Sequence, residues 1–189
     1  MTEDLRTKSV AEAMEYLRNT ARLFLPEPYC TLCLRASTDY DKGYGGAWHP
    51  YAYEGGLAVH VADVVRRCWQ MCRPEVNVSV LLTAAYWHDH CKLLEYRANP
   101  DGKVSYTAYA KQIGHVVGSV LAFSGLASNP DPSDTSVYYY VPAPERNAII
   151  HCMLTHHGRK EWGSPVEPTT IEAYILHSVD MLSSRAAAE

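Results

Sequence analysis

Residues 84–94 read AAYWHDHCKLL, and this stretch sets charged groups in the middle of an apolar helical pattern. Ala84, Ala85 and Leu93 are typical of a buried helix, whereas His88 and Asp89 are polar. Burying a polar group without a partner is costly, so such residues need a hydrogen-bonded network or a bound ligand. Other segments of the chain decide between these two explanations.

The composition is that of a globular protein with a sizeable core, because 47% of the 189 residues are hydrophobic and 20% are charged. The net charge of −4 gives no general attraction to nucleic acid or to anionic membranes. No apolar run reaches the roughly 18 residues that a membrane span needs, and the N-terminus does not resemble a secretory signal. The six cysteines lie in apolar helical stretches, as reduced thiols do. We therefore expect a cytoplasmic protein with no membrane partner.

The spacing of apolar residues predicts a mostly helical chain. Helices are expected over residues 8–25, 56–74, 76–94, 107–124, 145–157 and 169–184, and loops over 35–53 and 128–144. Pro-Asp-Gly at residues 100–102 predicts one small β-hairpin near 96–107. The expected fold is an all-α helical bundle in a single domain, residues 1–189. Residues 1–50 would form an N-terminal helix and loop, and 51–184 the core.

Five segments place histidines or carboxylates among small or apolar residues. These residues are His60, His88, Asp89, His115, His156, His157 and Asp180. A lone histidine on an apolar face is more often a satisfied core residue than a ligand, but here each segment would need its own buried partner. A shared metal site satisfies all of them together. Imidazole and carboxylate ligands without thiolate suit manganese, iron or zinc, and magnesium less well.

The order of these residues resembles the H…HD…D pattern of the HD-domain metal-dependent phosphohydrolases. His115 and the pair His156-His157 resemble the members of that superfamily that hold two metals. The segments HPYAYEGGLAVHVADVV (49–65), GHVVGS (114–119) and LTHHGRKEWGSPVEPTTIEAYILHSVDML (154–182) are similar to the HD domain of YhaM-type 3′-to-5′ exoribonucleases. The resemblance covers about residues 48–184 and implies an HD-domain bundle with a metal site at its centre.

The resemblance also implies a role for each of these residues. His60, His88, Asp89 and Asp180 would hold a first metal, and Asp89 would bridge to a second metal held by His115, His156 and His157. The expected cofactors are two divalent ions, manganese or iron first, with magnesium, nickel or zinc as alternatives. The implied function is a phosphohydrolase or phosphodiesterase that cleaves nucleotides or single-stranded nucleic acid with a metal-activated hydroxide.

Substrate contacts are expected from a few further residues. Lys92, four residues after His88 and on the same helix face, would stabilise a phosphate oxygen and join Asp89 as a catalytic residue. The alternative is a surface lysine with an exposed head group. Arg159 and Lys160, just after the histidine pair, and His49, before the glycine pair, are candidate substrate ligands. An exposed polar face is the alternative for Arg159 and Lys160.

The sequence departs from the resembling family before the HD core. That family carries an oligonucleotide-binding barrel there, whereas residues 1–50 predict helix and loop, so we expect no barrel in this chain. A nucleotide, a cyclic dinucleotide or a short single strand therefore fits as well as a long RNA. Two other functions stay open. One is an HD-type mixed-valent di-iron oxygenase, and the other is a catalytically inactive HD module that binds a nucleotide.

Overall fold

The structure is a computed structural model that describes residues 9–47, 50–128 and 139–185. The helices in this part of the chain are α1 (Val10–Phe24), α2 (Tyr29–Ala36), α3 (Gly56–Gln70), α4 (Val78–Trp87), α5 (Lys92–Glu95), α6 (Ala108–Gln112), α7 (Gly114–Ala127), α8 (Ala143–Thr155) and α9 (Ile171–Arg185). Two short 3₁₀ helices are η2 (Ser37–Lys42) and η4 (Lys160–Trp162). The strands β1 (Tyr96–Ala98) and β2 (Val104–Tyr106) pair in antiparallel fashion. The predicted all-α fold with one small hairpin is confirmed.

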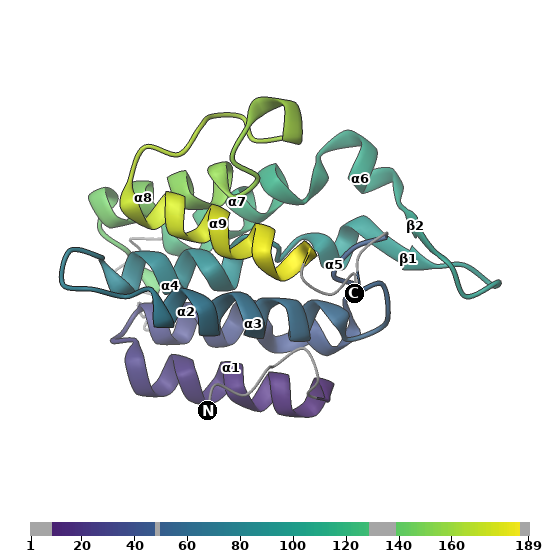
Figure 1. Cartoon of the computed structure of the whole chain (residues 1–189), viewed down its shortest axis with the longest axis horizontal. Coiled ribbons are helices and arrows are strands. Elements are labelled where there is room, and N and C mark those ends of the chain that lie inside the picture. The colour runs from purple at the N-terminus through teal and green to yellow at the C-terminus, as the bar shows by residue number, and fades with distance from the viewer. Residues whose placement is uncertain (1–8, 48–49, 129–138, 186–189) are drawn as a thin grey trace.

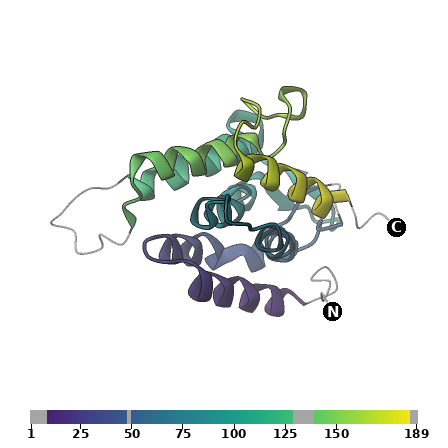
Figure 2. The same ribbon diagram turned by 60° about the vertical axis from the view of Figure 1, so that its left-hand side comes forward.

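The helices pack in layers around α3 and α4. Helix α3 contacts α1, α4 and α9, and α4 contacts α2, α8 and α9. Figure 2 shows α3 and α4 between α1 and α2 on one side and α7, α8 and α9 on the other, and the hairpin projects at one end in Figure 1. None of the helices that the structure describes has the length and the apolar character needed to cross a membrane.

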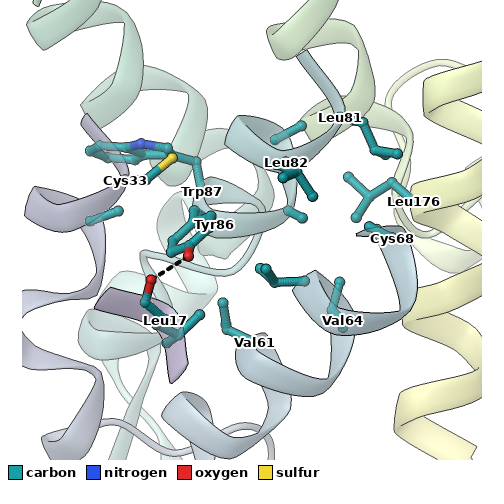
Figure 3. Packing of buried hydrophobic residues seen from close by; sticks show 14 of the residues in the cluster. Leu17, Cys33, Val61, Val64, Cys68, Leu81, Leu82, Tyr86, Trp87 and Leu176 are labelled. Atoms are coloured by element: carbon teal, nitrogen blue, oxygen red, sulfur yellow. Dashed lines mark hydrogen bonds between the residues drawn. The ribbon is translucent and has the colours of Figure 1, made fainter. Parts of the chain in front are cut away.

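Apolar side chains on facing helices hold these layers together. Residues 80–87 of α4 are all buried, as a helix enclosed on every side requires. Leu17, Val61, Leu82 and Leu176 come from α1, α3, α4 and α9 and meet in the core (Figure 3). The hydroxyl of Tyr86 donates a hydrogen bond of 2.6 Å to the carbonyl of Leu17, which satisfies two polar groups inside that core.

The prediction of one continuous helix over residues 76–94 is wrong. Helix α4 ends at Trp87, residues 88–91 form a turn, and α5 begins at Lys92. The carbonyls that would extend α4 accept from side chains instead: Ala85 O accepts from His88 Nδ1 at 2.8 Å, and Tyr86 O accepts from the Tyr40 hydroxyl. These side-chain bonds cap the helix end. The turn therefore falls on the segment that carries His88 and Asp89.

Three other predicted boundaries also change. The predicted loop over 35–53 is helical up to Lys42: the end of α2 and all of η2 lie in this range. The predicted helix over 107–124 is two helices, and Gly114 with φ of +72° lies at the break. Of the predicted loop over 128–144, residues 129–138 lie outside the described part, and α8 already begins at Ala143. The helices predicted over 8–25 and 169–184 are confirmed as α1 and α9.

A close backbone approach fixes the start of α3. Gly55 has φ of +83°, a left-handed conformation that glycine adopts readily. A Cβ on Gly56 would overlap the carbonyl oxygen of Tyr51. There is therefore no room for a side chain at position 56, where α3 begins. This glycine pair lets the loop before α3 lie against the helix that carries His60.

Candidate metal centre

The seven predicted metal ligands lie in two groups. The first is His60, His88, Asp89 and Asp180, and the second is His115, His156 and His157. Within each group the possible ligand atoms lie within 4.8 Å of one another. They come from α3, the turn after α4, the first turn of α7, the end of α8 and α9. The fold thus brings together side chains from five separate segments, in the same two groups that the family resemblance implies.

Asp89 lies between the two groups with one carboxylate oxygen toward each. Its Oδ2 is 3.1 Å from His60 Nε2 and 3.4 Å from His88 Nε2, both in the first group. Its Oδ1 is 3.4 Å from His115 Nε2 and 3.7 Å from His156 Nε2, both in the second. A carboxylate in this position can bridge two neighbouring cations.

Hydrogen bonds at Nδ1 orient three of the histidine rings. The acceptors are carbonyl or carboxylate oxygens: Ala85 O for His88 at 2.8 Å, Met153 O for His156 at 2.6 Å and Glu95 Oε2 for His115 at 2.6 Å. Because these oxygens only accept, each Nδ1 carries a proton and directs its Nε2 toward the centre. Metal-binding histidines are held by the same kind of outer hydrogen bond.

The buried nitrogen atoms of the centre fit a metal ion. The Nε2 atoms of His60, His88 and His156 are buried and make no hydrogen bond, although carboxylate oxygens lie 3.1 to 3.7 Å away. Buried polar atoms in proteins nearly always have a partner, and a cation in each group would provide one for these nitrogens. Neither group contains a cysteine, and the nitrogen and oxygen donors suit manganese, iron or zinc.

Burial and neighbouring charges set the protonation of these groups. Burial tends to raise the pKa of Asp89, but Lys92 and His88 outweigh it and lower this pKa well below its usual range. Burial, followed by the effect of neighbouring imidazoles, lowers the pKa of His157 to about 4 and that of His156 well below its ordinary value. Both imidazoles are therefore neutral near pH 7, which metal coordination requires.

His88 behaves differently because it faces two carboxylates. Burial lowers its pKa, but Asp89 and Asp180 more than offset this effect and raise the pKa to about 10. A cation that binds the first group therefore competes with a proton on His88. Metal binding there is expected to release a proton.

Lys92 is buried against the centre, with 7% of its surface exposed. Its ammonium group lies 2.6 Å from Asp89 Oδ2 and donates a hydrogen bond of 2.8 Å to the carbonyl of Gly45. The alternative of a surface lysine is therefore wrong. The expected shared helix face with His88 is also wrong, because the chain turns between these residues and Lys92 contacts Asp89 instead. A contact between Lys92 and a phosphate stays a prediction.

The other predicted substrate ligands line other hollows or lie outside the described residues. Arg159 lines a hollow with Tyr174 and His177, and Lys160 lines another hollow beside His151. The hollow that contains Lys92, His157 and Asp180 is lined by neither of them. His49 lies outside the part of the chain that the structure describes. Substrate binding by these three residues stays a prediction.

Two residues that support the ligands are missing from the sequence prediction. Glu95 Oε2 accepts from both the backbone N–H and the Nδ1 of His115, at 2.7 and 2.6 Å. Ser183 Oγ lies 3.2 Å from His60 Nδ1. Ser183 could have been found from its position three residues after Asp180, on the same helix face. Glu95 gave no such signal, because a glutamate in KLLE is typical of an exposed helix.

Asp63 is a further buried carboxylate on α3, outside the two groups of possible metal ligands. Its carboxylate is fully buried on α3 and pairs with Arg66 at 2.8 Å and Arg67 at 2.6 Å. These spacings of three and four residues place both guanidinium groups on the same helix face as the carboxylate. Asp63 therefore forms ion pairs with two arginines and belongs to neither group of metal ligands.

We predict that Glu95→Gln weakens metal binding at the second group by about 10- to 100-fold, the usual effect of losing an outer hydrogen-bond partner. Glutamine keeps the shape but removes the negative charge that makes the His115 imidazole a better ligand. Isothermal titration of chelator-stripped protein with manganese measures this affinity. Glu15→Gln, on the exposed side of α1, serves as the matched control. Equal manganese affinity in Glu95→Gln and wild type would show that Glu95 does not support this site.

Among known proteins, the chain is similar to curated proteins that share one name. No family model matches the chain, and no solved structure matches it. The chain is 31% identical over 140 residues to the 3′-5′ exoribonuclease YhaM of Listeria welshimeri. The matched residues make up 72% of this chain and 41% of that protein. It is 30% identical over 139 residues to the proteins of the same name from Oceanobacillus iheyensis and Bacillus velezensis, in each case covering 71% of this chain and 40% of the relative.

The chain thus spans about two fifths of the length of the curated relatives it matches. The chain itself folds into a helical bundle that brings two groups of histidine and aspartate side chains together. Together, the similarity and this architecture identify the chain as a YhaM-like HD-domain protein.

Proposed function

We propose that this chain is a metal-dependent phosphodiesterase that hydrolyses single-stranded nucleic acid or nucleotides. The observation that carries the proposal is Asp89, whose two oxygens face two separate groups of possible ligands. The relatives are named exoribonucleases, which supports RNA as the first substrate to test. In this proposal residues 51–184 form the catalytic HD core of a single domain.

The proposed centre holds two divalent ions, with manganese or iron as the best fit to its nitrogen and oxygen donors. His60, His88 and Asp180 would bind one ion, and His115, His156 and His157 the other, with Asp89 between them. Bound divalent ions would lower the pKa of a coordinated water and neutralise charge on phosphoryl oxygens.

The side chains of the protein prepare the site for this chemistry. Hydrogen bonds at Nδ1 hold the histidine rings in place, so the ligands need little reorganisation when substrate arrives. The ammonium group of Lys92 lies 2.6 Å from Asp89 Oδ2 and in this proposal would attract a phosphoryl oxygen. In the hydrolysis a water oxygen bonds to phosphorus, the ester P–O bond breaks, and the leaving oxygen gains a proton while the water loses one.

Metal-dependent turnover tests the proposal. Chelator-stripped protein receives manganese, iron, magnesium, nickel or zinc singly, and is offered bis-p-nitrophenyl phosphate, nucleotides, cyclic dinucleotides and labelled single-stranded RNA and DNA. We expect phosphodiester cleavage only when metal is added. Two bound ions per chain without cleavage of any substrate would contradict the proposal. In that case, oxygen consumption with iron would favour the oxygenase, and nucleotide binding without turnover would favour the inactive module.

A further inference from the structure

A hollow of about 290 Å³ lies directly beside the candidate metal centre. Its lining includes Lys92, His157, Trp162, Asp180, Met181 and Arg185. Ligand pockets in proteins commonly have volumes of ~300–1,000 Å³, so this hollow is at the small end of that range. Its volume suits one compact ligand group.

The lining combines two kinds of chemistry. His157 and Asp180 each belong to one of the two ligand groups, and Lys92 and Arg185 add positive charge. Trp162 and Met181 supply apolar surface in the same hollow. A ligand that matches this lining has an anionic end for the charged residues and a flat apolar end for the indole. A nucleotide has both.

Trp162 is the most distinctive part of this lining. It lies on η4, in the segment between the turn that carries His157 and helix α9, which carries Asp180, and 46% of its surface is exposed. The guanidinium of Arg159 lies over its ring, 5.1 Å from the ring centre, in a cation–π contact that restrains the indole. A restrained and partly exposed aromatic ring is a suitable platform for a nucleobase, because every base has a flat face that can stack.

We propose, resting on the proposed phosphodiesterase function, that this hollow binds the terminal nucleoside of a strand and that its base stacks on Trp162. Lys92 and Arg185 contact the adjoining phosphate, which lies next to His157 and Asp180. The hollow would accommodate one nucleoside together with its phosphate. Arg159 acts through Trp162 as a positioning residue.

Hydrolysis of matched RNA strands tests this site. The strands are identical except that one terminal residue, at the 3′ or the 5′ end, either carries a base or is abasic. We expect Trp162→Ala to lower kcat/KM about 10-fold on the strand with a terminal base and to leave the abasic strand unaffected. Trp162→Phe should retain most of the activity, because it keeps a face for stacking. Tyr174→Ala removes an exposed aromatic side chain from the neighbouring hollow and is the matched control.

Ligand affinity provides a second measurement that needs no turnover. Calorimetry on metal-free protein compares adenosine 5′-monophosphate with ribose 5-phosphate. Trp162→Ala should reduce the affinity for the nucleotide about 10-fold, to that of ribose 5-phosphate, and leave the latter unchanged. An equal effect of Trp162→Ala on both ligands and both strands, or no effect on any, would overturn the proposed base site. Absence of all phosphodiester cleavage by wild type would refute the proposed function, and the affinities would still decide whether Trp162 binds a base.

Discussion

Asp89→Asn is expected to reduce phosphodiester hydrolysis by at least about 10³-fold, because metal-ion stabilisation of phosphoryl charge is worth several kcal/mol. Asp89 Oδ2 faces His60 and its Oδ1 faces His115, so this side chain serves both groups of ligands. Asparagine keeps the shape of the side chain but replaces one oxygen with an NH₂ group, which cannot coordinate a cation. The variant also loses a negative charge that would balance part of the positive charge of two buried cations.

Two measurements separate this effect from misfolding. Circular dichroism should show that Asp89→Asn keeps the helical content of wild type, and elemental analysis should show fewer than two bound ions per chain. Asp63→Asn is the control, because it removes the charge of another buried carboxylate, whose ion pairs among the described residues are with Arg66 and Arg67. Its hydrolysis should stay near the wild-type rate. Wild-type hydrolysis in folded Asp89→Asn would exclude the bridging role.

Lys92→Met is expected to lower kcat/KM for phosphodiesters by about 10²-fold, the scale of losing one electrostatic contact to the transition state. Burial lowers the pKa of Lys92, but Asp89 and Asp180 outweigh this effect and raise the pKa above its ordinary value, so the side chain carries a positive charge. Methionine fills a similar volume without that charge. The substrate phosphate would then lose a cation beside Asp89.

Metal affinity distinguishes the two roles that Lys92 could have. Removing a positive charge near the ligands should leave manganese binding equal to wild type or tighter, if Lys92 acts on the substrate. A large loss of manganese binding together with activity would instead show that Lys92 only holds Asp89 in place. Lys103→Met, in the exposed hairpin, is the control for loss of a lysine charge. Hydrolysis by Lys92→Met at the wild-type rate would exclude both roles.

The candidate ligands were predictable from the sequence because they are polar residues within apolar helical segments. Polar residues such as His60 and Asp180 stand out among apolar neighbours, and helices that bury such faces have to bring them together. The resemblance to the HD-domain family then divided these residues into two groups, and the geometry has the same division.

Features that depend on partners distant in the sequence were not predictable. The end of α4 depends on the hydroxyl of Tyr40, which lies 46 residues before the carbonyl that it caps. The burial of Lys92 depends on the carbonyl of Gly45, in a segment with no regular pattern. Glu95 looks like an exposed helical glutamate until His115 is placed beside it. In each case the local sequence is compatible with another outcome, and a tertiary contact decides between them.

Anomalous diffraction from crystals of chelator-stripped protein soaked in manganese is the most direct test of the dinuclear centre. We predict two anomalous peaks per chain, one among His60, His88 and Asp180 and one among His115, His156 and His157, with Asp89 between them. Peaks only at other positions, or no more than one peak at this centre in crystals saturated with manganese, would contradict a two-metal site.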